Sequence, residues 1–191
     1  CIIHHTGSDN TDGTIAWFKD PKSEVSAHYV IAQDGRVVQM VDERLKAWHA
    51  GPAHWHGQRE RIGDRSIGIE LVNKGDGLTQ FPEAQMKALA ALVRDIRIRH
   101  DIPIYHVVGH KHVAWPPGRK DDPAENFDWE RLRDLLEQLQ GEELPMPLPA
   151  PTPAPPMLRQ GATGQAVVDP QARLTTLGFD PGPLDGKFGG R

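Results

Sequence analysis

A run of prolines limits which parts of this chain can form regular structure. Between Pro145 and Pro156 almost every second residue is proline. Proline has a fixed φ angle and no backbone N–H, so this stretch forms neither a helix nor a central strand. We therefore expect three parts: a main domain over residues 1–140, a Pro-rich linker over residues 141–156, and a tail over residues 157–191.

The composition allows one sizeable core. The chain has 191 residues, 38% of them hydrophobic, which suits one main domain and a minor one. Its formal net charge of -4 gives no electrostatic reason to bind nucleic acid, so we expect no such partner. No apolar run approaches the roughly 20 residues that span a bilayer, so we expect no transmembrane segment. The only cysteine is Cys1, so no disulfide can form within the chain.

Residues 1–140 alternate short strand patterns with two helical patterns. The strands are expected at residues 1–4, 28–32, 37–41, 66–72 and 107–109. Asp34-Gly35 favours a tight turn, which makes the second and third strands antiparallel neighbours. Apolar residues at helical spacing begin near Pro82 and again after Asp128, a good N-cap. This order predicts an α/β fold with a mixed central β-sheet flanked by helices.

Two of the expected strands carry ionisable side chains. In the first strand alternation points His4 and His5 to opposite sides, so only one of them faces a given site. In the fourth strand Glu70 shares a face with Gly68, a residue that leaves space for close approach. A buried carboxylate in a strand is costly unless it is paired or used. Glu70 is therefore in an ion pair or in a site.

A third segment, from Gly109 to Pro123, combines a strand end, a Pro-Gly loop and many ionisable groups. Such a loop, held by a rigid scaffold, suits a functional site. Taken alone, residues 119–122 are equally compatible with a solvated charged turn. The ten histidines of the chain are by themselves weak evidence for a metal site.

These segments belong to an ordered set of motifs that resembles the type 2 N-acetylmuramoyl-L-alanine amidases. That family is related to phage amidase lysozymes and to peptidoglycan recognition proteins. The matching motifs are Ile2 to Thr6, Val25 to Gly35, Ala47 to Gly51, Ser66 to Leu71, and Gly109-His110 with Pro117 to Pro123. The resemblance covers about residues 1 to 130. It implies an amidase-like fold and hydrolysis of the amide between N-acetylmuramic acid and L-alanine in peptidoglycan or muropeptides.

The resemblance also assigns chemical roles. It implies that His4, His110 and Asp122 bind one Zn²⁺ ion, leaving the fourth tetrahedral position for water. Glu70 would act as the general base and later protonate the leaving amine. Lys120 would stabilise the oxyanion of the tetrahedral intermediate.

Substrate contacts are less sharply assigned. Trp48 and His49 contact substrate or form an aromatic wall beneath the groove, and His28 contacts substrate, supports the site or is structural. The partner is expected to be peptidoglycan or a muropeptide. We expect a monomer in the periplasmic or extracellular cell-wall space, although no export signal is visible in the chain.

Three features depart from the family pattern. Trp115 and an extra proline lengthen the loop between the second histidine and the lysine. His112 stands where many members have Asp, and it either competes with His110 or lies on the surface. Ala27 replaces a tyrosine that phage and animal relatives commonly use, so this chain must depend on Glu70.

Two other functions fit the same sequence. One is a metallopeptidase that cuts within the stem peptide, using the same metal chemistry. The other is non-catalytic peptidoglycan recognition, which the presence of all the ligand and catalytic candidates disfavours. The tail resembles the first part of a three-helix peptidoglycan-binding module without its later helices, so we expect an incomplete module and assign it no wall-binding activity.

Overall fold

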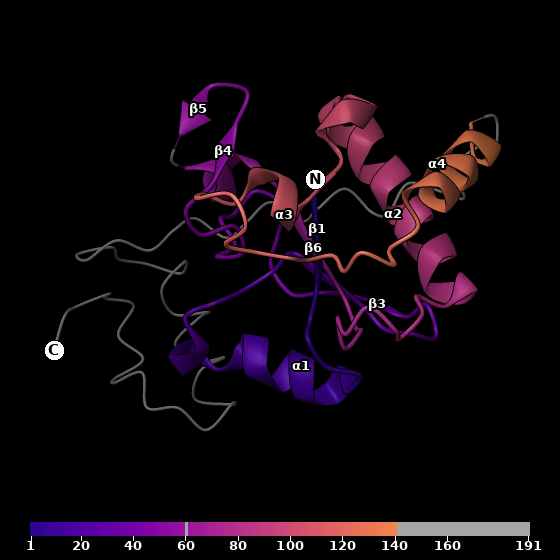
Figure 1. Cartoon of the computed structure of the whole chain (residues 1–191), viewed down its shortest axis with the longest axis horizontal. Coiled ribbons are helices and arrows are strands. Elements are labelled where there is room, and N and C mark those ends of the chain that lie inside the picture. Colours follow the sequence, from indigo (N-terminus) through magenta and orange to yellow (C-terminus); the bar gives the residue numbers. More distant parts are fainter. Residues whose placement is uncertain (60, 141–191) are drawn as a thin grey trace, which may run out of the picture. The chain divides into compact units, whose positions relative to one another are not determined.

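A five-stranded mixed sheet organises the computed structural model, which describes residues 1–59 and 61–140 (Figure 1). The predicted linker and tail lie outside the described residues. The strand order is β3-β2-β6-β1-β7, with bounds Ile2–His5 (β1), Tyr29–Ile31 (β2), Val37–Gln39 (β3), Gly68–Leu71 (β6) and Val108–Gly109 (β7). β3 is antiparallel to β2, whereas β2, β6, β1 and β7 are parallel to one another. The predicted mixed α/β fold is confirmed.

The sequence predicts some of the described α-helices better than others. They are α1 (Thr11–Lys19), α2 (Glu83–His100), α3 (His110–Val113) and α4 (Trp129–Gln138). α2 and α4 were predicted, with Pro82 and Asp128 at their N-caps. α1 was missed because Thr14 is its only buried residue, so it has no apolar stripe. The hairpin of β4 (His54–Trp55) and β5 (Gln58–Arg59) was missed because strands of two residues show no alternation.

One face of the sheet packs against α2 and α4 to form the core, and these two helices lie side by side in Figure 1. The sheet contributes alternate residues of β1, β2 and β6, together with the residue directly before β6: Ile3, Tyr29, Ile31, Ile69, Leu71 and Ile67. The helices contribute the predicted apolar faces: Met86, Leu89, Val93, Ile96, Leu132, Leu135 and Leu136. Within the described ranges no helix has the length and apolar character needed to cross a membrane.

The other face of the sheet carries polar groups. In the parallel pairing of β1 with β6, His4 lies opposite Glu70. Since side chains alternate along a strand, both point away from the face that Ile3 and Ile69 bury. β7 ends beside them, and α3 begins directly after it with His110. The carboxyl ends of parallel strands, where ligands commonly bind in such sheets, therefore gather these side chains.

The N-cap of α4 provides a direct test of how this helix is held. Oδ1 of Asp128 accepts a hydrogen bond of 2.8 Å from the backbone N–H of Arg131. Asp128→Ala should lower the free energy of unfolding by about 1 kcal/mol, since a first-turn N–H loses its partner. Asp128→Asn, which keeps a capping oxygen, should remain close to wild type in urea unfolding. Equal loss in both variants would contradict the capping role.

Candidate metal centre

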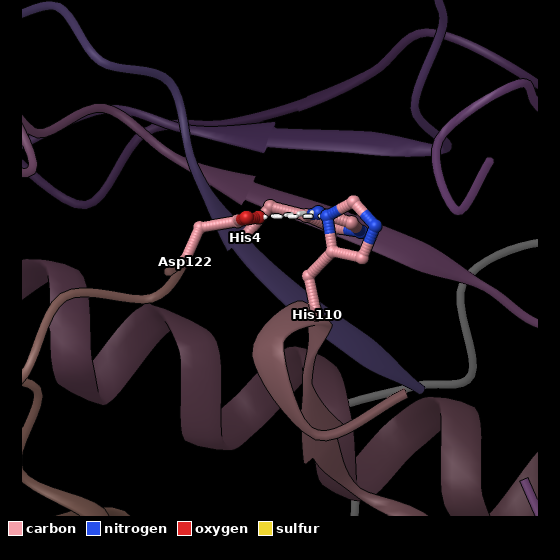
Figure 2. Close-up of side chains that lie close together, drawn as sticks. All are labelled: His4, His110 and Asp122. Carbon is pink, nitrogen blue, oxygen red and sulfur yellow. Dashed lines mark hydrogen bonds and ion pairs between the residues drawn. The ribbon is translucent and has the colours of Figure 1, made fainter. Parts of the chain in front are cut away.

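Three buried side chains from distant parts of the sequence point toward one another (Figure 2). Oδ2 of Asp122 lies 2.8 Å from Nδ1 of His4 and 3.1 Å from Nδ1 of His110. One ligand atom from each residue lies within 4.8 Å of the other two, and we call His4, His110 and Asp122 the metal group. Over residues 1–59 and 61–140, this is the only group of at least three His, Cys, Asp or Glu side chains that could hold a metal ion.

Backbone contacts hold the loop of Asp122 against the strands. The N–H of Lys111 donates to the carbonyl of Asp122 at 2.8 Å, which ties the segments of two candidate ligands together. The N–H of Ala124 donates to Nδ1 of His5 at 3.1 Å. His5 thus anchors the loop that carries Asp122, and it lines the same cavity as His4, although alternation predicts that the two point to opposite sides.

The glycine before His110 is required by close packing. A Cβ added to Gly109 would lie 2.7 Å from Cδ of Pro123, too close for any real contact. Directly after Gly109, His110 occupies the first position of α3. Gly109 therefore lets the Asp122-Pro123 segment approach the end of β7.

The protonation states of two of these residues, His4 and Asp122, suit metal binding. Burial lowers the pKa of His4 to about 4, so its imidazole is neutral near pH 7. Burial opposes ionisation of Asp122, but its contacts with His110 and His4 hold the pKa of its carboxyl well below the usual range. Neutral imidazoles and an ionised carboxylate are the forms that coordinate metals. The donor set therefore fits a divalent cation.

Glu70 lies beside this group with an unsatisfied oxygen. Its Oε2 atom is buried and has no hydrogen-bond partner among the residues that the structure describes. Burial raises the pKa of Glu70 to about 8, the charge of Asp122 adds to the rise, and Lys120 opposes it. A carboxyl that titrates near neutral pH is suited to accept and return a proton. Of the two alternatives for Glu70, these observations favour a site over an ion pair.

The metal group opens into a cavity of about 510 Å³. Every residue that the sequence analysis assigned to the site lines it: His4, Trp48, His49, Glu70, His110, Lys120 and Asp122. α1 adds Thr14, Trp17 and Phe18, which the sequence analysis missed. Trp17 and Trp48 are 57% and 58% exposed, so both indole surfaces are available to a ligand. The adjacent aromatic residues Trp17 and Phe18 were the sequence signal that could have revealed this wall.

His49 has protein partners at both ring nitrogens. Its Nδ1 lies 3.0 Å from Nε2 of His4, and its Nε2 lies 3.2 Å from Oγ of Ser66. Contact of Trp48 and His49 with substrate stays a prediction. Because both ring nitrogens of His49 have protein partners, only the face of its ring could contact a substrate.

Two other histidines have structural partners. His28 is buried, with Nδ1 accepting from the N–H of Gly68 and Nε2 donating to the carbonyl of Leu45. Nδ1 of His112 accepts from the N–H of Gly109 at 3.0 Å. Neither ring lines the cavity or joins the metal group within the described residues. His112 therefore does not compete with His110.

The lengthened loop is fastened beside the site. The N–H of Trp115 donates to the carbonyl of Pro52 at 3.0 Å, and Ala114 forms a β-bridge with Ala53. The guanidinium of Arg119 donates to the carbonyls of Ala50 and Pro52. The extra residues thus extend the contact with residues 50–53, and the neighbouring Lys120 still reaches the cavity.

The raised pKa of Glu70 predicts a pH-dependent stability in the metal-free protein. The folded state binds this proton more tightly than the unfolded chain, because burial raises the pKa from 4.5 to about 8. The resulting stabilisation is complete below pH 4.5 and is lost as the pH rises through 8. With chelator present, the free energy of unfolding of wild type should fall relative to Glu70→Gln over this range. Identical pH profiles in urea unfolding would contradict the assignment.

Comparison with known proteins shows the family of this chain. A family profile described as N-acetylmuramoyl-L-alanine amidase matches residues 1–125. The N-acetylmuramoyl-L-alanine amidase AmiD of Escherichia coli is 38% identical over 145 residues, covering 69% of this chain and 50% of the relative. The 1,6-anhydro-N-acetylmuramyl-L-alanine amidase AmpD of Salmonella typhimurium is 38% identical over 131 residues, covering 69% of this chain and 67% of the relative.

A solved structure shares the fold. It is the complex of Escherichia coli AmiD with anhydro-N-acetylmuramic acid-L-Ala-D-gamma-Glu-L-Lys, with a TM-score of 0.63 and 36% identity, covering 70% of this chain and 55% of that one. The chain spans about half the length of AmiD, 50% in the sequence comparison. From the matched family and the shared fold together, the chain belongs to the N-acetylmuramoyl-L-alanine amidase family.

Proposed function

We propose that this chain hydrolyses the amide bond between N-acetylmuramic acid and L-alanine in peptidoglycan or muropeptides. One observation carries the proposal: the side chains of His4, His110 and Asp122 meet at one point, with Glu70 on the adjacent strand. The names of the matched relatives, which are amidases of this bond, support the reaction. We propose a monomer that acts in the periplasmic or extracellular cell-wall space, where intact peptidoglycan lies.

We propose Zn²⁺ as the metal, one ion in this domain. Two imidazole nitrogens and one carboxylate oxygen form a donor set that zinc favours, and three protein ligands are typical of catalytic rather than structural sites. When bound, zinc would lower the pKa of water towards about 7 and polarise the scissile carbonyl.

The chain's own residues would carry the proton and the charge. Glu70 takes the proton of the attacking water, because it lines the same cavity as the metal ligands and its buried Oε2 has no hydrogen-bond partner among the described residues. It then delivers a proton to the leaving amine of L-alanine. Lys120, which lines the same cavity, stabilises the negative charge that develops on the carbonyl oxygen.

The cavity walls suit a muramyl peptide. Trp17 and Trp48 present exposed indoles beside the metal group, and aromatic faces pack well on apolar faces of sugar rings and peptide methyl groups. The solved AmiD complex holds anhydro-N-acetylmuramic acid joined to L-Ala-D-gamma-Glu-L-Lys. That muramyl tripeptide is therefore our first test substrate.

Product analysis tests the reaction. Purified sacculi and the muramyl tripeptide should release intact stem peptide with a free L-alanine amine, and a zinc chelator should abolish release. Glu70→Gln should lower kcat by about 10² to 10⁴-fold, because proton transfer is lost. Lys120→Met should lower it by about 10² to 10³-fold, because the oxyanion loses its cation.

The matched control is Lys74→Met, since Lys74 pairs with Asp9 at the surface and does not line the cavity. It should retain wild-type kcat. Shorter peptide fragments would indicate a metallopeptidase, and binding of muropeptide without any cleavage would indicate a recognition protein. Wild-type turnover by Glu70→Gln would overturn the assignment of the base.

The two tryptophans that line the cavity predict that removing either indole lowers the affinity for substrate. Trp17→Ala and Trp48→Ala should each raise KM about tenfold, because a lost aromatic contact costs about 1.4 kcal/mol, while kcat changes little. Tyr105→Ala is the control, because Tyr105 is 63% exposed but lies outside the cavity lining. Unchanged KM in both tryptophan variants would show that substrate occupies another part of the surface.

A further inference from the structure

We propose that His49 is a positioning residue that fixes the metal-binding tautomer of His4, through a hydrogen-bonded chain that ends at Ser66. The inference rests on the metal site of the proposed function, but not on which bond the site cleaves. It gives His49 a different role from the substrate contact that the family resemblance implies.

The chain of contacts is continuous. Nε2 of His4 lies 3.0 Å from Nδ1 of His49, and the two rings meet edge to face at 87°. Nε2 of His49 lies 3.2 Å from Oγ of Ser66, which in turn donates its proton to the carbonyl of Ile62 at 2.7 Å. Four residues from three segments are thus connected from the metal group to the backbone.

The backbone carbonyl at the end of this hydrogen-bonded series determines the direction of every hydrogen bond in it. The carbonyl of Ile62 can only accept, so the hydroxyl of Ser66 must donate to it. Oγ of Ser66 is then left to accept from Nε2–H of His49. In a neutral imidazole the other nitrogen is an acceptor, so Nδ1 of His49 accepts from Nε2–H of His4.

This direction leaves a lone pair on Nδ1 of His4, the nitrogen that faces Asp122. Nδ1 lies 2.8 Å from Oδ2 of Asp122. With the proton of His4 on Nε2, both atoms are acceptors, and two acceptors at this distance repel each other unless a cation lies beside them. The hydrogen-bond chain therefore prepares His4 for a metal ion and disfavours the alternative in which His4 simply donates to Asp122.

His110 has the same arrangement through a simpler partner. Its Nε2 lies 2.9 Å from the carbonyl of Ala50, which can only accept, and 3.4 Å from the guanidinium of Arg119, which can only donate. The shorter contact favours donation from Nε2–H to Ala50, which leaves Nδ1 free for the metal. His49 and Ala50 are consecutive residues. One short segment therefore sets the tautomers of both candidate histidine ligands, as outer partners of metal-bound histidines commonly do.

Packing prevents the ring of His49 from leaving this position. A Cβ on Gly68 would lie 2.4 Å from Cγ of His49, so the ring lies directly against β6 where only glycine fits. On another side His28 contacts it, with ring centroids 5.7 Å apart. The glycine noted beside Glu70 in the sequence thus makes room for His49.

Zinc affinity, measured by chelator competition on the full chain without substrate, tests the inference. His49→Asn places an amide oxygen where Nδ1 of the imidazole lies, so it can still accept from His4 and should bind zinc within a few-fold of wild type. His49→Gln places its amide at the Nε2 position and should bind zinc about tenfold to hundredfold more weakly. Ser66→Ala should weaken binding severalfold, because the tautomer of His49 is no longer fixed.

A pair of glycine variants tests the packing without changing any residue of the hydrogen-bonded series. Gly68→Ala should displace His49 and lower zinc affinity, whereas Gly63→Ala, whose Cβ would have only ordinary contacts at 3.7 Å, should not. Proton–nitrogen correlation NMR of zinc-loaded wild type should show the ring proton of His49 on Nε2. Circular dichroism of each metal-free variant checks that it is folded.

The outcomes separate this inference from the proposed function. Wild-type zinc affinity in His49→Gln, or a ring proton of His49 on Nδ1, would overturn it, and a change confined to KM would return His49 to a substrate contact. Failure of the wild-type protein to bind zinc would also overturn the inference about His49. If wild type binds zinc and the variants behave as expected but no amide is cleaved, the positioning role holds and the proposed reaction is wrong.

Discussion

The parallel pairing of β1 with β6 is the constraint on which the rest of the site depends. It places His4 opposite Glu70, and the alternation of side chains turns both away from the core that Ile3 and Ile69 fill. A slip of one residue in either strand would move a charged or polar group into the core and an isoleucine into the cavity. The hydrophobic core on one face therefore maintains the register that the chemistry on the other face requires.

The second half of the metal group comes from a loop that has little regular structure of its own. Asp122 is held because the backbone of its segment bonds to Lys111 and because the following residue, Ala124, bonds to His5. His4 and His5 therefore have complementary tasks: one faces the metal group, and the other fastens the loop that completes it. This division explains why two adjacent histidines end β1.

Sequence reasoning located what local pattern and motif could reveal. It found the five strands of the sheet, the antiparallel pairing of two of them and the two core helices, because alternation and helical spacing are properties of neighbouring residues. The ordered motifs, through the family they resemble, named the candidate metal ligands. It missed α1, whose only buried residue is Thr14, and it therefore missed Trp17 in the cavity wall. It left His28 and the lengthened loop undecided, because their partners lie in distant segments. It also left His112 undecided, although its partner Gly109 lies only three residues away.

The sequence by itself determined the fold class and the family, since these follow from residue patterns and ordered motifs, and the family resemblance named the candidate metal ligands. Only the tertiary structure decided what each of those residues touches. Nδ1 of His49 meets His4 across 45 positions of sequence, and Asp122 meets it across 118. Hydrogen bonds over such separations depend on strand order and on space left by residues such as Gly68, neither of which is written in any local pattern.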